Sequence, residues 1–193
     1  GFDRMLSFVS ATVDALSGNI QYAAIQYSDV ITEEFNFKYR LKKDLMEEIT
    51  SMKYDSGWST YTGLAVEKAW SMLFDQRFGA RNAVTKIMVI LTDGRTKDDI
   101  EKISESIKNA GDTTVLAVGT NSAPLEELLT LATSKEHAFY THELADIFHL
   151  FAQLIDKICV TQENKQKIAT TTTTTATTTT SSTISFTSVS SLV

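Results

Sequence analysis

The sequence predicts an α/β protein with a doubly wound, mostly parallel sheet, one antiparallel edge strand and helices on both faces. First, in the stretch from Lys86 to Gly94 a run of apolar residues over Ile87 to Leu91 ends abruptly in Thr92-Asp93-Gly94. An unbroken apolar run of this kind is typical of a strand buried on both faces of a parallel sheet. Second, strand-like and helix-like segments alternate along the chain, as they do in proteins with a mostly parallel sheet. Third, only a short turn at Ser28-Asp29 joins two strand-like segments, so these two strands form an antiparallel pair.

In the first half of the chain, hydrophobic spacing and turn residues define each element. Apolar residues recur at helical spacing from Phe2 to Leu16, which predicts an amphipathic helix that needs a sheet to pack on. Gly18-Asn19 ends this helix. The expected order is a helix over 2–16, strands over 20–28 and 31–37, a helix over 41–52, a polar and aromatic loop over 54–63 and a helix over 66–73.

The second half repeats the pattern of a strand followed by a helix. After the strand that ends at Asp93, Asp98 and Asp99 start a helix that Gly111 closes. Acidic residues suit that position because the helix dipole favours negative charge at the N-terminus. The expected order is then a strand over 113–118, a short helix over 124–131, a short strand over 138–140 and a long amphipathic helix over 144–158.

Composition excludes several classes of function. The 193 residues are enough for one ordinary domain with a sizeable core. The net charge of -6 argues against nucleic acid binding, and no apolar run approaches the length of a membrane span. The single Cys159 excludes an internal disulfide and a cysteine-based zinc site. Because the chain opens at Gly1 with neither an initiator Met nor a signal peptide, we expect it to be a piece of a longer protein.

A sharp change in composition predicts where the folded domain ends. From Thr170 to Ile184 nearly every residue is Thr or Ser, and a segment of that composition cannot bury a core. We therefore expect residues 1–160 to form the domain and residues 161–193 to be a disordered tail. The tail is either inert or an O-glycosylated stalk, although mucin-like stalks usually contain Pro and this segment has none.

Two loops should meet at the carboxyl edge of the sheet, where open α/β sheets bind their ligands. One contains Asp93 and Gly94, and the other runs from Ser59 to Gly63. From the strand and turn alone, Asp93 is equally well interpreted as a cap or turn residue. A hydroxyl and a carboxylate together, however, suit a hard cation such as Mg2+.

The chain resembles the von Willebrand factor type A domain family over about residues 1–160. The resembling residues, in the family's order, are Ile25 to Asp29 with Glu34-Phe35, then Ser59 to Gly63, then Gly79-Ala80-Arg81 before residues 86–94, and finally Ile158-Cys159. The short link after Asp93 and the terminal Cys159 are most similar to matrilin and collagen members. The resemblance implies the Rossmann-like fold of this family.

The family holds Mg2+ or Mn2+ at a metal-ion-dependent adhesion site, and the resemblance implies that Thr60 and Asp93 are metal ligands. The family's other ligand motif, Asp-x-Ser-x-Ser after the first strand, occurs nowhere in this chain. We expect that motif and its central strand to lie upstream of Gly1. The neighbouring strands would then lack a partner and leave an open slot in the sheet. A chain truncated in this way should be less stable and should hold metal weakly or not at all.

The resemblance implies a non-enzymatic adhesion or matrix-assembly module that is secreted or belongs to a cell-surface ectodomain. Its partner would be a collagen or another matrix or cell-surface protein, bound through an acidic residue that completes the metal's coordination. Candidate ligand-binding residues around the metal are Ser59, Trp58, Tyr61, Gly94 and Arg95.

These candidates also have structural interpretations. Trp58 and Tyr61 are equally interpreted as packing over their loop, Ser59 as shaping it, and Arg95 as part of a solvated turn. By resemblance, Cys159 would pair with a cysteine outside this chain; otherwise it is an unpaired thiol.

Two other functions stay open. One is a metal-independent scaffold with the same fold, which a degraded upstream motif would favour. The other is a Mg2+-dependent hydrolase, for which the Thr60–Asp93 pair gives the only support. The chain contains no Gly-x-Ser-x-Gly, no Gly-x-Gly-x-x-Gly and no phosphate-binding loop.

Overall fold

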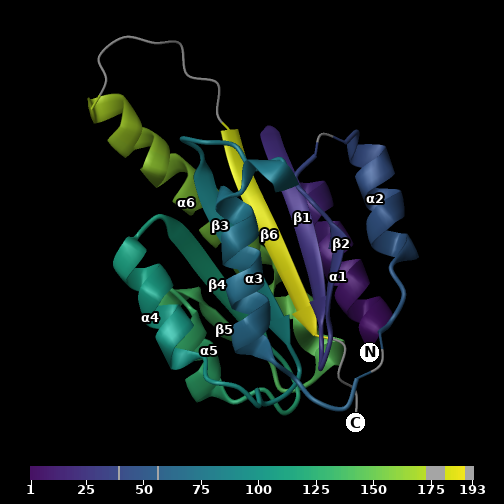
Figure 1. The fold of residues 1–193 in the computed structure, drawn as a ribbon. Helices are drawn as coiled ribbons and strands as arrows, with labels where there is room; N and C mark the ends of the chain where they lie inside the picture. The colour runs from purple at the N-terminus through teal and green to yellow at the C-terminus, as the bar shows by residue number, and fades with distance from the viewer. Residues whose placement is uncertain (39, 56, 173–180, 190–193) are drawn as a thin grey trace.

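The computed structural model describes residues 1–38, 40–55, 57–172 and 181–189 and places six strands in one sheet (Figure 1). The strand order is β2-β1-β6-β3-β4-β5. Only β2 runs antiparallel to its neighbour, which confirms the predicted fold class. The strands are β1 (Asn19–Tyr27), β2 (Ile31–Phe35), β3 (Thr85–Thr92), β4 (Thr113–Gly119), β5 (Ala138–Tyr140) and β6 (Ser181–Val189).

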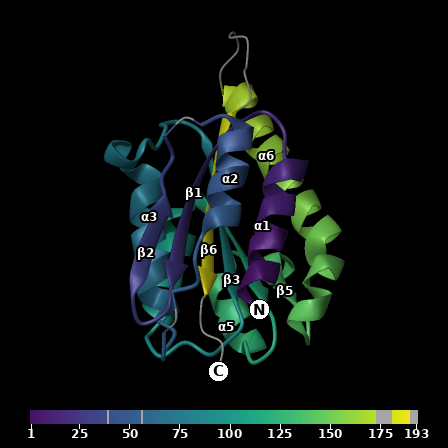
Figure 2. The same ribbon diagram turned by 90° about the vertical axis from the view of Figure 1, so that its right-hand side faces the viewer.

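Helices cover both faces of the sheet and enclose two separate cores. Figure 2 views the sheet along its edge, with α3 on one side and α1, α2 and α6 on the other. None of the helices in the described part of the chain combines the length and apolar character that a membrane span requires. The helices are α1 (Phe2–Ala15), α2 (Lys42–Ser51), α3 (Thr62–Phe74), α4 (Glu101–Ala110), α5 (Leu125–Leu131) and α6 (Phe151–Thr172), with short 3-10 segments at Gln76–Phe78, Lys135–His137 and Leu144–Leu150.

The strand predicted just before Asp93 is β3, and all eight of its residues are buried. Its side chains alternate between the two cores, because successive residues of a strand point to opposite faces. Ile87, Val89 and Leu91 pack in the core beneath α1, α2 and α6. Met88 and Ile90 pack in the core beneath α3, α4 and α5. A strand that serves two cores needs apolar side chains on both of its faces, which explains the unbroken run from Ile87 to Leu91.

The C-terminal segment differs from the disorder predicted for it. α6 continues to Thr172, and β6 lies between β1 and β3, at the centre of the sheet (Figure 1). β6 pairs in parallel with both neighbours, so that Ile184 stands opposite Tyr22 on one side and Ile87 on the other. The predicted open slot is therefore filled from within the chain. The boundary near residue 160 stays a prediction, and residues 173–180 and 190–193 lie outside the described part.

Composition did not predict this strand, because disorder was expected from the scarcity of apolar residues in the segment. Thr is β-branched and fits a pleated surface, and the main chain of β6 bonds to two strand edges that would otherwise be open. The side chain of Ile184 is fully buried in the core beneath α1, α2 and α6. The buried Ile184 and two ladders of main-chain hydrogen bonds place this segment in the sheet.

A cross-loop cap fixes the start of α3. Among the described residues, the N-cap Tyr61 makes no side-chain capping bond. The Asp98 carboxylate does so from a distant loop, since it accepts hydrogen bonds from the Gly63 amide at 3.0 Å and the Leu64 amide at 2.8 Å. The Thr96 hydroxyl donates to the same carboxylate and accepts from the Thr62 amide at 3.0 Å. Asp98 lies before the first residue of α4. Its hydrogen bonds join the two loops of the predicted site.

Replacing Ile184 by alanine tests whether the C-terminal segment lies in the sheet. We expect Ile184→Ala to lower the free energy of unfolding by about 2–5 kcal/mol, the usual cost of truncating a fully buried Ile. Urea unfolding followed by circular dichroism measures this change. Val30→Ala is the control: that side chain is exposed, so its effect should stay within about 0.5 kcal/mol. Equal stability of Ile184→Ala and the unmodified chain would show that the segment lies outside the fold.

Asp98→Ala tests the cap on α3. We expect it to lower the free energy of unfolding by about 0.5–2 kcal/mol, because the Gly63 and Leu64 amides lose their acceptor. Glu67→Ala on the exposed face of the same helix removes an equal charge without touching the cap. Equal losses in the two variants, measured by the same urea unfolding, would mean that the cap contributes nothing.

Candidate functional site

Thr60 and Asp93 lie in neighbouring loops at the carboxyl edge of the sheet. Asp93 directly follows β3, and Thr60 lies two residues before α3. Both are buried, with only 4% of Thr60 and 6% of Asp93 exposed. The Lys97 amide, in the loop after β3, donates to the Thr60 carbonyl at 2.8 Å. The structure therefore brings the two predicted loops together, as the strand order required.

The loop after β4 supports Asp93 from the other side. The Ser122 amide donates to the Asp93 carbonyl at 3.2 Å, and the Thr120 amide donates to the Thr92 carbonyl at 3.0 Å. These bonds hold the main chain on both sides of the Asp93 carboxylate. The main chain of Asp93 is thus held by hydrogen bonds from a neighbouring loop.

The loop that carries Thr60 is pressed against the turn between β1 and β2. The Tyr61 amide donates to the Ser28 carbonyl at 3.1 Å. Gly57 approaches the same turn so closely that a Cβ atom there would lie 2.2 Å from Asp29 Oδ1 and 2.3 Å from Ser28 Oγ. A Cβ atom here would force these two side chains to shift, so glycine suits the contact and the resembling Ser28-Asp29 pair supports the loop.

Beneath the site lies a buried hydroxyl that the sequence analysis missed. Tyr27, the last residue of β1, is fully buried, and burial is the main cause that raises the pKa of its phenol. The negative charges of Asp93 and Asp98 raise that pKa further, while the neighbouring Thr62 and Thr92 hydroxyls oppose the shift. Within the described part of the chain, the Tyr27 hydroxyl has no partner at normal hydrogen-bond geometry. In the sequence, the feature that could have identified Tyr27 as a site residue was its position at the carboxyl end of a predicted strand.

The donor set fits a metal ion only in part. The buried Thr120 hydroxyl also lacks a hydrogen-bond partner among the described residues, and its loop is bonded to the Asp93 carbonyl. Unpartnered buried hydroxyls beside a carboxylate favour water or a cation at this edge. Against this, the described residues contain no group of three or more His, Cys, Asp or Glu that could hold a metal. A cation would therefore rely on the Asp93 carboxylate and on hydroxyl or water oxygens.

The other predicted ligand-binding residues differ in exposure. Trp58 is 96% exposed, so packing over its loop is excluded for this side chain. Tyr61 and Ser59 are half-buried, as is Gly94. Their roles in ligand binding stay predictions.

Arg95 and Cys159 are the remaining residues that the sequence analysis singled out. Arg95 is exposed and forms ion pairs of 3.4 Å with Glu126 and Glu127 at the start of α5. Cys159 is a free, half-buried thiol, and burial, followed by the charges of Glu163 and Asp156, raises its pKa. A disulfide partner outside the chain stays a prediction.

Sequence comparison gives relatives among matrix-type proteins. Human matrilin-1 is 31% identical over 169 residues, which cover 84% of this chain and 34% of that protein. The mouse collagen alpha-4(VI) chain is 30% identical and is covered over 8% of its length. The chain thus spans about a third or less of these two relatives.

Structural comparison gives the same fold. Proximal thread matrix protein 1 from the mussel byssus superposes with a TM-score of 0.77 at 24% identity, over 82% of this chain and 43% of that one. Another structure of that protein has a zinc-occupied MIDAS motif, the metal-ion-dependent adhesion site.

A family model locates this similarity within the chain. The von Willebrand factor type A domain model matches residues 1–153. The matched region contains β1 to β5 and the site around Thr60 and Asp93, whereas β6 lies outside it. The chain belongs to the von Willebrand factor type A domain family.

Proposed function

We propose that this chain is a non-enzymatic adhesion or matrix-assembly module that binds an acidic residue of a protein partner through a divalent cation. The observation that carries the proposal is the buried Asp93 carboxylate, which lies with Thr60 at the carboxyl edge of the sheet. Mg2+ or Mn2+ suits these oxygen ligands. When bound, the ion supplies an open coordination position for the partner's carboxylate.

The surface beside the site suits a protein partner. Trp58 exposes nearly its whole side chain, and Val30 and Leu64 are also mostly exposed. Val30 lies in the turn that Gly57 touches, and Leu64 lies in the first turn of α3. Trp residues are enriched among those that contribute most to binding energy. The expected partner therefore carries apolar side chains beside its acidic residue.

The relatives suggest where such a module acts. Similarity to matrilin-1, to a collagen chain and to a byssus matrix protein supports a secreted or cell-surface setting with a matrix protein as partner. Collagen is the first candidate to test.

A metal-independent scaffold is the second candidate function. It is favoured by the lack of an acidic cluster among the described residues, and a degraded upstream motif would favour it further. A scaffold of this kind would bind its partner equally well with and without a chelator.

Asp93→Ala tests the metal-dependent site. We expect the affinity for Mn2+ and for immobilised collagen to fall by about 100-fold or more, because even changes outside the coordination sphere typically cost 10–100-fold in metal affinity. Isothermal titration and a solid-phase binding assay measure the two affinities. Glu105→Ala, an exposed acid on α4, is the control for lost charge. Unchanged binding by Asp93→Ala would reject the proposal.

Metal should also stabilise the fold. At a Mg2+ concentration about 100 times the dissociation constant, linkage adds about 2.7 kcal/mol to the free energy of unfolding. We therefore expect the melting temperature to rise from EDTA to millimolar Mg2+, and to rise less for Asp93→Ala. Collagen binding that persists in EDTA, with no rise in melting temperature, would support the metal-independent scaffold.

A further inference from the structure

A buried phenol lies between the two loops of the candidate metal site. Tyr27 ends β1, and its side chain packs in the core beneath α3, α4 and α5. The next residue, Ser28, accepts a hydrogen bond from the Tyr61 amide, in the loop that carries Thr60. The Tyr27 side chain is fully buried, and its hydroxyl has no hydrogen-bond partner among the described residues. Such a group needs an explanation, because an unpaired buried hydroxyl costs free energy.

The polar groups around this hydroxyl belong to both loops. Burial raises the pKa of Tyr27, and the neighbouring Thr62 and Thr92 hydroxyls oppose that rise. The charge of Asp93 adds to it. Thr62 is the first residue of α3 and lies two residues after Thr60, while Thr92 directly precedes Asp93. The phenol thus adjoins one residue from each loop that carries a predicted metal ligand.

Thr62 is the better placed acceptor for the phenol proton. The Thr92 hydroxyl already donates to the Gly94 carbonyl at 3.1 Å and accepts from the Gly94 amide at 3.4 Å. The main chain of Thr62 is held separately, because its amide donates to the Thr96 hydroxyl at 3.0 Å. A phenol keeps its proton at neutral pH and can donate it. An adjustment confined to side chains would therefore complete a bond from Tyr27 to Thr62 and leave the start of α3 in place.

We propose that Tyr27 is a positioning residue for the metal edge, whose hydroxyl donates to the Thr62 hydroxyl when a cation is bound. The bond holds the loop that carries Thr60 in place beside Asp93. This inference rests on the proposed function, because it concerns the same cation site. The hydroxyl then strengthens metal binding and adds nothing to stability without metal. Groups outside the coordination sphere that orient metal ligands typically change metal affinity by about 10–100-fold.

Tyr27→Phe tests this role because it removes the hydroxyl and keeps the ring. In EDTA, we expect its urea-unfolding midpoint to equal or exceed that of the unmodified chain, since the hydroxyl that is removed has no partner to lose. Isothermal titration of the full chain should give an affinity for Mn2+ that is about tenfold lower. A lower midpoint in EDTA with an unchanged affinity for Mn2+ would show a merely structural role and overturn the proposal.

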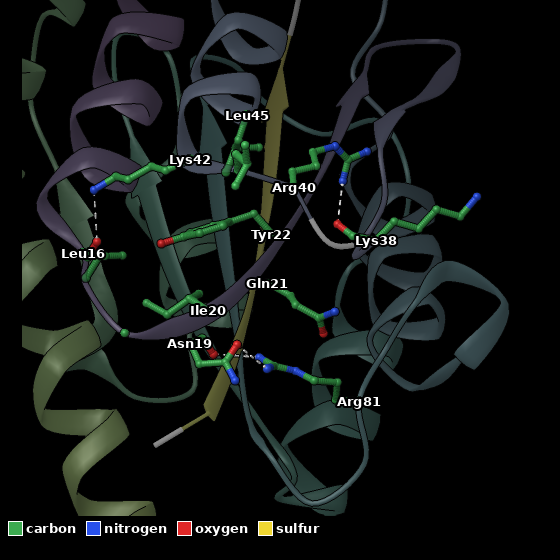
Figure 3. Close-up of a pocket in the computed structure, with 12 residues that line it drawn as sticks. Leu16, Asn19, Ile20, Gln21, Tyr22, Lys38, Arg40, Lys42, Leu45 and Arg81 are labelled. Carbon is green, nitrogen blue, oxygen red and sulfur yellow. Dashed lines mark hydrogen bonds between the residues drawn. The ribbon is translucent and has the colours of Figure 1, made fainter. Parts of the chain in front are cut away.

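Tyr22→Phe is the matched control, because it removes a phenol hydroxyl from the same strand on the other face of the sheet. Tyr22 packs against the core beneath α1, α2 and α6 and lines a cavity of about 400 Å³ near the start of β1 (Figure 3). Its loss of a hydroxyl lies away from the metal edge, so the affinity for Mn2+ should stay within about twofold of the unmodified chain. An equal loss in Tyr22→Phe and Tyr27→Phe would contradict a specific role for Tyr27.

Thr62→Val identifies the acceptor, since valine keeps the β-branched shape without the hydroxyl. If the two hydroxyls form one bond in the metal-bound chain, Thr62→Val lowers the affinity for Mn2+ as well, and adding Tyr27→Phe lowers it little further. Losses that multiply in the double variant would reject the bond between the two hydroxyls. If circular dichroism shows that Tyr27→Phe is unfolded, Thr62→Val decides alone.

Asp93→Ala separates this inference from the proposed function. If the unmodified chain binds Mn2+ and Asp93→Ala does not, the cation site is real, and equal affinities of Tyr27→Phe and the unmodified chain overturn the role of Tyr27 alone. If the unmodified chain binds no Mn2+, the proposed function fails and this inference fails with it.

Discussion

The parallel pairing of β6 with both β1 and β3 is the interaction on which the rest of the structure depends. β1 and β2 form one part of the sheet and β3, β4 and β5 form the other, and β6 is the strand that joins them. Without β6, the facing edges of β1 and β3 would lack main-chain hydrogen-bond partners at the centre of the sheet. The core on one face would lose Ile184, which packs against residues of α1, α6 and β3. The core beneath α1, α2 and α6 therefore relies on a segment outside the matched family region.

The same pairing has a consequence for the site. β6 ends opposite Tyr27 and Leu91, so it delivers the chain to the edge where Asp93 lies. Within the described part of the chain, no group of three or more His, Cys, Asp or Glu could hold a metal at this edge, so a cation there would rely on the Asp93 carboxylate and on hydroxyl or water oxygens.

Hydrogen bonds tie together the loops that form the candidate site. Asp98 caps α3 from the loop after β3, and Ser122 holds the carbonyl of Asp93 from the loop after β4. Gly57 allows the loop before α3 to touch the β1–β2 turn. These contacts fix the positions of Thr60 and Asp93 through main-chain groups, so a partner would meet a preorganised edge. Preorganisation reduces the ordering cost of binding.

The sequence by itself determined the elements whose signals are local. The apolar run of β3, the helical spacing of α1 and the turn at Ser28-Asp29 each follow from burial or backbone geometry within a few residues, and the order of strands and helices placed Thr60 and Asp93 at one edge. Only the tertiary structure decided that a Thr- and Ser-rich segment becomes β6, because its stability comes from two distant strand edges. The Asp98 cap and the surroundings of the buried Tyr27 hydroxyl likewise depend on contacts between residues far apart in the chain, which no local pattern records.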